Sequence, residues 1–276
     1  MADNASRAVE RTPAQAPAQP RSSRLRTLKR TAVAHALGTT ALGFIVLIIV
    51  VAIAAPLVAT HAPLYQDYTA VFAKPSPDHF FGTDRLGRDV FSRVVYGARV
   101  SLAVGVLAVS VGMILGVPLG LVAGYARGWV DNVLMRFMDA ILVIPGLIFA
   151  LTIIAILKPT LWNVMIALGI DAMPRYARLI RGQARSVMEN EYIAASRALG
   201  CSSRRIIFRH VFPNALSPVI VQASLAMGGA VLAEAGLGFL GVGVQPPTPT
   251  WGSVLNQGAP YLERAWWVSF FPGLAI

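Results

Sequence analysis

Five stretches without Asp, Glu, Lys or Arg dominate the pattern of polar and apolar positions along the chain. They are Thr31–Thr60, Val100–Ala126, Ala140–Leu157, His210–Ala233 and Ala235–Leu262. About 20 consecutive apolar residues suffice to cross a bilayer as a helix, so each stretch predicts membrane-spanning structure. In the last stretch, Pro246 and Pro247 stop the helix. The pattern predicts an all-α integral membrane protein.

The basic residues set the expected orientation of these spans. Of the 24 Lys and Arg residues, seven lie in residues 1–30 and eight lie between Arg175 and Arg209. Clusters of this kind between apolar stretches are typical of multispanning proteins, whose cytoplasmic loops are rich in Lys and Arg. If both clusters face the cytoplasm, an even number of spans separates them. The sequence therefore predicts a cytoplasmic N-terminus.

Three spans are plain in the hydropathy between the two basic clusters, near residues 35–59, 100–124 and 138–158. The even number requires a fourth, which we place at 160–180. With the span after the second cluster, we expect a polytopic helical bundle of five full spans. We expect the sixth to be truncated, because Ala265–Ile276 covers only about 18 Å of a hydrocarbon core near 30 Å.

The same pattern divides the chain into regions. We expect a disordered basic cytoplasmic tail at 1–30, the first transmembrane helix at 31–60, a periplasmic loop with an amphipathic segment at 61–99, and a transmembrane domain at 100–276 with a cytoplasmic loop at 181–214. A cleavable signal peptide is the alternative for the first apolar stretch, since Ala52-Ile53-Ala54 resembles a cleavage site. Its apolar run is longer than the usual length of about 7–15 residues, which favours a permanent span.

Composition excludes several classes of protein. The chain is 55% apolar and only 13% charged, whereas soluble domains carry about 25% charged residues. A mean hydropathy of +0.61 agrees with a membrane protein. The net charge of +11 could suggest nucleic acid, but its clustering between apolar stretches argues against that partner. The single cysteine, Cys201, excludes an internal disulfide and a cysteine-based zinc site.

Small and acidic residues within the spans are the first candidates for a special role. Four glycines spaced four apart predict close packing of a second helix against one stripe, or else a substrate-lining surface; they are Gly112, Gly116, Gly120 and Gly124. Glu234 and Asp139 are acids within or beside apolar spans, where charge is costly. Each belongs either to the translocation path or to a structural ion pair, and Arg136 is the neighbour expected to pair with Asp139. Asp171 and Arg175, four residues apart, predict a local pair.

A charged segment, Gly82–Arg93, lies in the expected periplasmic loop. Its pattern is amphipathic, and Arg88, Asp89 and Arg93 are candidate contacts for a partner on the outer side of the membrane. Scaffolding of the loop is the alternative. Charge reversal at Arg88 and Arg93 would distinguish the two.

The most informative stretch is EYIAASRALGCSSRRIIFRHVFP, from Glu191 to Pro213. It predicts a short helix over Glu191–Leu199, a left-handed stop at Gly200 and a second helix capped by Ser202 or Ser203. The small residues of the first helix leave a shallow surface on which a partner can dock.

This stretch resembles the EAA loop of the inner-membrane permease subunits of bacterial binding-protein-dependent ABC importers. The loop positions read Ala194-Ala195-Ser196, then Gly200, then Pro213, and the signature glutamate position holds Ala194, with Glu191 the nearest acid. Three further stretches resemble the C-type permease of dipeptide, oligopeptide and nickel importers: His79–Leu102, Leu161–Gln183 and Ala233–Gly252. The resemblance covers about residues 35–276.

The resemblance implies a permease subunit in the bacterial inner membrane that forms half of a translocation pathway for di- or oligopeptides. It implies a second permease subunit, two ATPase subunits docked on the EAA-like loop, and a periplasmic or lipid-anchored binding protein. Arg88, Asp89 and Arg93 are then the candidate contacts for the periplasmic binding protein. An importer of nickel or another small solute is the alternative within the family, and a passive channel is the alternative outside it.

The sequence indicates no catalysis by this chain. It contains no GxxxxGK[ST] phosphate loop, so we expect no ATP hydrolysis by that route. HExxH, GxSxG and paired metal-ligand motifs are also absent from the sequence. We therefore expect no bound cofactor or metal, with ATP and magnesium on the partner subunits.

Overall fold

The computed structural model describes residues 36–276, so the expected basic tail lies outside the described residues. All regular elements in this range are helical, apart from one isolated bridge between Thr83 and Asp89. The chain divides into two compact units, Met1–Val46 and Leu47–Ile276. The boundary falls inside the apolar helix α2, Ala36–Ile53.

The first apolar stretch forms two helices. After α2, the short helix α3 covers Ala55–Val58, with Ala54 between them. Pro56 lies in the first turn of α3, and because it has no N–H it cannot complete the hydrogen bond of a continuous helix. Side chains of α2 such as Leu42 and Phe44 are more than half exposed. An apolar helix exposed in this way is typical of a membrane span.

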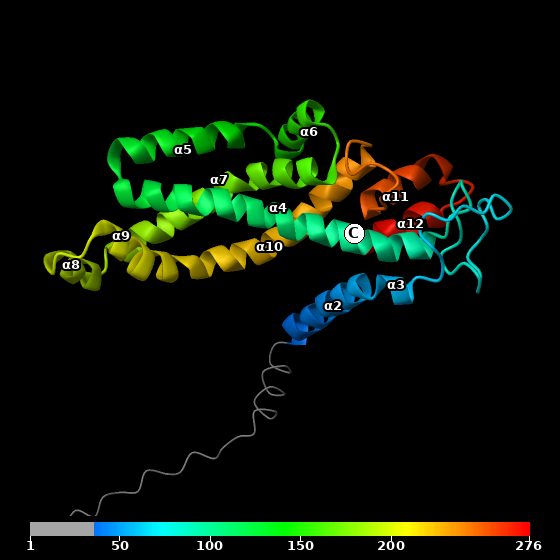
Figure 1. The fold of residues 1–276 in the computed structure, drawn as a ribbon, viewed down its shortest axis with the longest axis horizontal. Helices are drawn as coiled ribbons and strands as arrows, with labels where there is room; N and C mark the ends of the chain where they lie inside the picture. Colours follow the sequence, from blue (N-terminus) through cyan, green and yellow to red (C-terminus); the bar gives the residue numbers. More distant parts are fainter. Residues whose placement is uncertain (1–35) are drawn as a thin grey trace, which may run out of the picture. The chain divides into compact units, whose positions relative to one another are not determined.

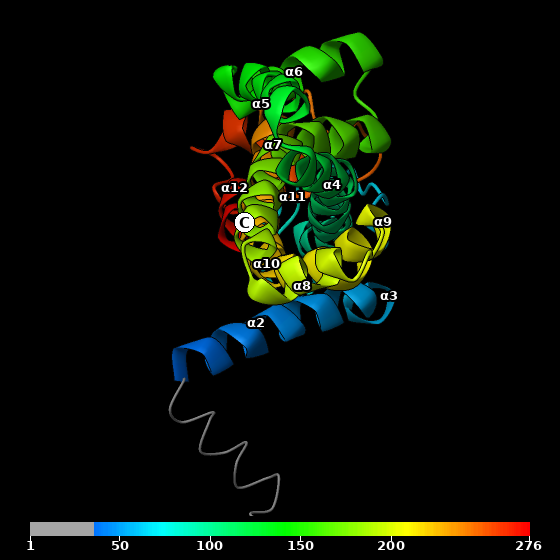
Figure 2. The same cartoon turned by 90° about the vertical axis from the view of Figure 1, so that its left-hand side faces the viewer.

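Three long helices form the core of the second unit. They are α4 (Val90–Ala126), α7 (Leu161–Met188) and α10 (Phe212–Phe239), and they lie side by side in Figures 1 and 2. α4 and α7 share the most extensive interface. The fourth predicted span, at 160–180, corresponds to α7 from Leu161 onward, but α7 is not among the described helices that are apolar enough to cross a membrane by composition alone.

The four glycines of α4 form the seam with α7. A Cβ added to Gly120 would lie 2.2 Å from the carbonyl oxygen of Ala177, and one added to Gly116 would lie 2.4 Å from that of Met173. Gly112 and Gly124 also face α7, at Gly169 and Arg181. Only a residue without a side chain permits this approach, and close backbone contact gives helices in lipid their van der Waals packing.

The third predicted span, at 138–158, corresponds to two helices instead of one continuous helix. The structure has α5 (Gly128–Val143) and α6 (Gly146–Leu157), bent by 91° at the break between them. Ile144 is extended because Pro145 follows it, and a residue before proline avoids the helical region. A hydropathy profile does not predict this bend, because it averages residue polarity without regard to backbone direction.

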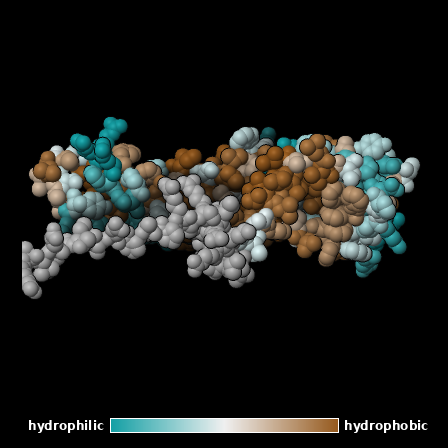
Figure 3. Space-filling model, turned by 90° about the horizontal axis from the view of Figure 1, so that it is seen from below, coloured by the Kyte–Doolittle hydropathy of each residue, from teal (hydrophilic) through white to brown (hydrophobic). Residues whose placement is uncertain are grey.

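Length and composition support membrane insertion. Among the described residues, Val90–Ala126 and the continuous helix Ser203–Phe239 are long and apolar enough to cross a membrane, and the bent pair α5–α6 qualifies as a third. In Figure 3, hydrophilic side chains gather at the two ends of the visible face, and hydrophobic ones lie between them next to the grey residues. This distribution is the one that a bilayer requires.

The remaining elements lie at the two ends of the core helices. At one end are α8 (Glu191–Ala198), α9 (Ser203–Ile206) and the π-helix η1 (Ile207–Val211). At the other are α11 (Trp251–Gly258), the 3₁₀ turn η2 (Ala259–Tyr261) and α12 (Trp267–Ala275). We call these the α8 end and the α11 end (Figure 1).

The loop at the α11 end is shorter than the predicted 61–99. α4 already begins at Val90, because the Asp89 side chain accepts a hydrogen bond from the Ser92 backbone N–H and caps the helix. Asp is a strong helix cap. Within the loop, Gly87 has φ +70, and a Cβ there would lie 1.7 Å from the Asp67 carbonyl oxygen.

Candidate functional site

A cavity of about 340 Å³ lies between α4, α6, α7 and α10. Most of its lining is small or apolar, and its polar side chains are Asp171, Arg175 and Gln222. We call it the central cavity. Polar and ionised side chains at membrane depth usually face a cavity or a partner and mark the path of a solute.

The predicted local pair of Asp171 and Arg175 is present in the cavity wall. Arg175 Nη2 donates to Asp171 Oδ2 at 3.0 Å, with the carboxylate largely buried and the guanidinium half exposed. A Cβ added to Gly146 would lie 2.8 Å from Asp171 Oδ1, so α6 starts directly against this carboxylate. The positive end of the α6 dipole therefore stabilises the acid.

We predicted from their spacing that Asp139 pairs with Arg136, and this pairing is wrong. Asp139 pairs instead with Arg178 of α7, and the Asp139 side chain is half exposed. The two residues are 39 positions apart, so the pairing depends on how α5 lies against α7. An exposed pair of this kind contributes about 0–1 kcal/mol.

A second acid, Asp131, joins α5 to α7 more firmly. It is almost fully buried and accepts from both Arg181 and Arg185, and the Arg181 Nη2–Asp131 Oδ2 bond measures 2.7 Å. Two guanidinium groups on one carboxylate form a charge-assisted network. We did not predict this contact from the sequence, because each arginine lies at least 50 positions from Asp131 along the chain.

The segment between α7 and α10 has the local structure that its sequence predicts. α8 ends at Ala198, Gly200 takes φ +76, and the Ser202 side chain accepts from the Arg205 N–H to cap α9. The helix, the left-handed glycine and the serine cap are therefore confirmed. Pro213 follows the π-helical turn η1 inside the continuous helix Ser203–Phe239, and it has no N–H to donate to the preceding turn.

One face of α8 is presented to solvent. Glu191, Ala194 and Ala195 are exposed, Ser196 is partly exposed, and Ile193 alone in this helix is buried. Leu199, which follows α8, is 85% exposed. Leu199 is a candidate docking residue, because burying a large apolar side chain against a partner removes its surface from water. It was absent from our sequence-based candidates.

Arg88, Asp89 and Arg93 are buried, contrary to the surface position that we predicted. Arg88 Nη2 and Arg93 Nη2 donate to Gln257 Oε1 at 2.7 and 3.1 Å, and Arg88 Nε donates to Asp84 Oδ2 at 2.7 Å. These bonds tie the loop to α11. The side chains scaffold the α11 end from inside, and Arg85 is the exposed cation of this segment.

His61 and His79 converge on Asp89, a cluster that we did not predict from the sequence. The ligand atoms of the three residues lie within 4.8 Å of one another. Asp89 Oδ1 accepts from His79 Nδ1 at 3.0 Å, and Asp89 Oδ2 accepts from the Ser92 N–H and hydroxyl at 2.8 and 2.7 Å. Hydrogen bonds thus occupy both carboxylate oxygens, and the cluster joins the loop to the start of α4.

Glu234 is fully buried where α10 meets α4 and α11. Its Oε2 accepts from the Ser101 hydroxyl at 2.9 Å, and the same hydroxyl accepts from the Trp251 N–H at 3.3 Å. Glu234 Oε1 has no hydrogen-bond partner within the described residues. These contacts hold three helices together and favour the structural alternative for this acid.

A family model described as "Binding-protein-dependent transport system inner membrane component" matches residues 116–276. This range is more than half of the chain and includes most of the lining of the central cavity, α8 and Glu234. The chain belongs to this family. A second model, the N-terminal transmembrane domain of oligopeptide transport permease C, matches residues 25–75.

Curated relatives of the permease match most of its length. The dipeptide transport system permease protein DppC of Alkalihalophilus pseudofirmus is 44% identical over 83% of this chain and 75% of its own. The glutathione transport system permease protein GsiD of Pectobacterium atrosepticum is 40% identical over 84% and 78%. The probable D,D-dipeptide transport system permease protein DdpC of Escherichia coli is 42% identical over 84% and 78%.

Among solved structures, an inward-facing MetNI methionine ABC transporter matches the permease fold with a TM-score of 0.57. The match covers 66% of this chain and 87% of the other, at 20% identity, and it supports the fold alone. The permease is thus a multi-pass inner-membrane protein of an ABC transporter, and ATP hydrolysis belongs to separate subunits. Transporters of this family also depend on a binding protein.

Proposed function

We propose that this permease carries short peptides inward as one half of an ABC importer. It pairs with a second, different permease chain, docks two ATPase subunits and receives peptides from a periplasmic or lipid-anchored binding protein. The three relatives named for dipeptides, glutathione and D,D-dipeptides support a peptide substrate. The chain itself binds no cofactor, and ATP with magnesium binds the partner subunits.

The proposed topology places the α8 end in the cytoplasm and the α11 end in the periplasm. The basic cluster from Arg175 to Arg209 supports this orientation. The spans are then α2–α3, α4, the bent pair α5–α6, α7 and α10, with α12 part of a sixth. The N-terminal tail lies in the cytoplasm, and the loop ending at Asp89 lies outside.

Peptides are proposed to pass through the central cavity, which is this chain's part of the translocation pathway. A dipeptide carries a cationic amine and an anionic carboxylate, and the Asp171–Arg175 pair offers both complementary charges beside Gln222. The glycines and alanines of the lining leave room for varied side chains. Positioned charges in an otherwise small-residue cavity suit a substrate class with constant ends and variable middles.

The observation that carries the proposal is the exposed face of α8, held between two helices that extend into the membrane. The proposed ATPase contacts are Glu191, Ala194, Ala195 and Ser196 on α8, together with Leu199, Gly200 and Pro213. Closure of the ATPase subunits moves this short helix, and α7 and α10 transmit the movement to the cavity that they line. In energetic terms, nucleotide binding to the partner biases a two-state membrane element.

The test is reconstitution of the complete transporter. The permease is co-expressed with the neighbouring permease and ATPase gene products, purified as one complex, and supplied with binding protein loaded with a dipeptide or left empty. We expect peptide-loaded binding protein to stimulate ATP hydrolysis and peptide uptake into vesicles. Stimulation by a nickel-loaded or other solute-loaded protein, with none by peptides, would replace the substrate class. Uptake without ATP would refute the importer.

A further inference from the structure

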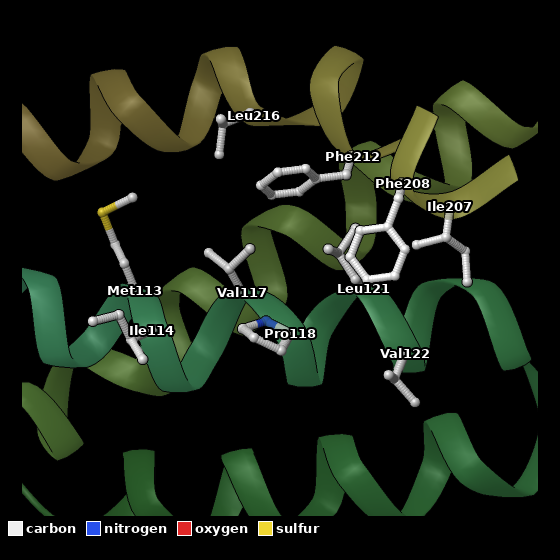
Figure 4. Close-up of a pocket in the computed structure, with 10 residues that line it drawn as sticks. All are labelled: Met113, Ile114, Val117, Pro118, Leu121, Val122, Ile207, Phe208, Phe212 and Leu216. Atoms are coloured by element: carbon white, nitrogen blue, oxygen red, sulfur yellow. The ribbon is translucent and has the colours of Figure 1, made fainter. Parts of the chain in front are cut away.

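A second hollow, distinct from the central cavity, is open at the surface of the chain. It is an apolar groove of about 550 Å³ between the last turns of α4 and the η1–α10 segment. Figure 4 shows its ten lining side chains, of which six come from α4 and four from η1 and α10. All ten are apolar, so no peptide charge has a partner there.

The groove is open to the surroundings of the chain. Ile114 on its rim is 70% exposed and Phe208 is 63% exposed, and Figure 4 shows Phe208 and Phe212 in the gap facing α4. Phe208 belongs to the π-helix η1, whose Phe212 N–H donates back five residues to Ile207. Single π-helical turns are frequent at functional sites, because they realign the side chains of a helix.

Phe208 also borders a shallow polar pocket, lined further by Ser202, Arg204 and Arg205. Phe208 therefore lines both the apolar groove and an adjacent pocket with two guanidinium groups and a hydroxyl. Neither arginine has an ion-pair partner within residues 36–276. Because this pocket begins at the α8 end, it lies at the cytoplasmic membrane surface in the proposed topology.

We propose that this composite site binds an anionic phospholipid of the inner leaflet. One acyl chain lies in the apolar groove, and the headgroup phosphate receives hydrogen bonds from Arg204, Arg205 and the Ser202 hydroxyl. The volume suits a small-molecule ligand, whose pockets span about 300–1,000 Å³. Basic pockets beside membrane helices on the cytoplasmic side recognise anionic headgroups, and arginine forms bidentate bonds with phosphate. A zwitterionic lipid fills the groove equally well but gains less from the arginines.

The lipid bridges the cytoplasmic end of α4 and the start of α10. These helices also border the central cavity, and the headgroup lies next to the proposed ATPase contact. This inference rests on the topology in the proposed function, but its chemistry is independent of the transported substrate. Arg204 and Arg205 lie close to α8, so substituting them could change ATP hydrolysis by disturbing the ATPase contact. The amount of bound lipid is therefore the measurement that tests this site.

The experiment is native mass spectrometry of the purified complete transporter, delipidated and incubated with equal amounts of phosphatidylglycerol and phosphatidylcholine. We expect the wild type to retain phosphatidylglycerol severalfold over phosphatidylcholine. The variant Arg204→Gln/Arg205→Gln loses this preference, whereas the control Arg127→Gln/Arg136→Gln, with the same charge change outside both pockets, keeps it. Ile114→Trp, which fills the groove from its exposed rim, reduces retention of both lipids.

Three outcomes would overturn the proposal. Equal retention of the two lipids by the wild type would show that no anionic site exists. Retention of inorganic phosphate by the wild type but not by Arg204→Gln/Arg205→Gln, with no preference for phosphatidylglycerol in either protein, would assign the arginines to a free anion. Absence of retained lipid, combined with crosslinking of a Phe208→Cys variant to the second permease, would show that a protein helix covers the groove. None of these outcomes depends on peptide transport.

Discussion

Glu234 shows how a single buried acid can serve the fold of a transporter. Its carboxylate lies out of solvent and shares the Ser101 hydroxyl with the backbone of α11. Removing one partner of a buried hydrogen bond leaves the other unsatisfied, at a cost of about 1–3 kcal/mol. The acid thus holds α4, α10 and α11 at one point, close to where the α11 end begins.

The variants Glu234→Gln and Glu234→Ala separate a structural from a chemical role. Glu234→Gln keeps an oxygen that accepts from Ser101, so we expect near-normal peptide uptake. Glu234→Ala removes this acceptor and leaves a cavity, so we expect a clearly lower unfolding temperature of the detergent-solubilised transporter. Loss of uptake in a Glu234→Gln protein of normal stability would instead place the carboxyl in the pathway.

Asp171 makes a different prediction, because it faces the central cavity. Asp171→Asn removes the negative charge while keeping the size of the side chain. We expect the KM for peptide uptake to rise severalfold with little change in the amount of assembled complex, since the peptide amine loses its charged partner. An unchanged KM would argue that peptides do not contact this wall.

At the scale of elements, two kinds of helix contact differ. The seam between α4 and α7 is tightly packed, whereas the short helix α8 is largely exposed. The seam leaves no room for a side chain at Gly116 and Gly120 and little at Gly112 and Gly124, so α4 and α7 are held in close contact along their length. α8 instead contacts its own chain mainly through Ile193 and keeps most of its surface for a partner. A rigid pair joined to an exposed lever suits transmission of movement from one subunit to another.

The seam is tested by Gly120→Ala against Gly228→Ala. The first substitution places a methyl group against the Ala177 carbonyl, whereas nothing lies within 4 Å of a Cβ on Gly228. Overpacking costs about 1–3 kcal/mol, so we expect Gly120→Ala to lower the stability of the complex. Gly228→Ala is expected to be neutral or slightly stabilising, because alanine favours the helix. Equal stability of both variants would contradict the seam.

The docking role of α8 is tested by Leu199→Asp. The side chain is 85% exposed, so the permease is expected to fold normally. We expect ATP hydrolysis to lose its stimulation by peptide-loaded binding protein and uptake to fall strongly, since a charge replaces an apolar contact. Leu199→Met should retain both activities. Normal coupling in Leu199→Asp would show that the ATPase docks elsewhere.

At the scale of the whole molecule, local chemistry was predictable and long-range geometry was not. The glycine at 200 and the cap at Ser202 depend on their immediate neighbours, and both follow from the sequence. The bend between α5 and α6 at Pro145 was not predicted, because hydropathy says nothing about the direction of the backbone. The burial of Arg88 depends on Gln257, which is 169 positions away.

The central claim is that the loop around Gly200 faces the cytoplasm, and Cys201 tests it directly because it is the only cysteine in the chain. A membrane-impermeant maleimide is applied to spheroplasts and to inside-out vesicles. Since Cys201 is partly buried, Ser203→Cys in a Cys201→Ser background gives a second, exposed reporter, and Lys74→Cys in that background reports the opposite side. We expect both reporters in the loop to react only in inside-out vesicles, and Lys74→Cys to react in spheroplasts. Labelling of the loop in spheroplasts would contradict the topology and, with it, the docking of ATPase subunits on α8.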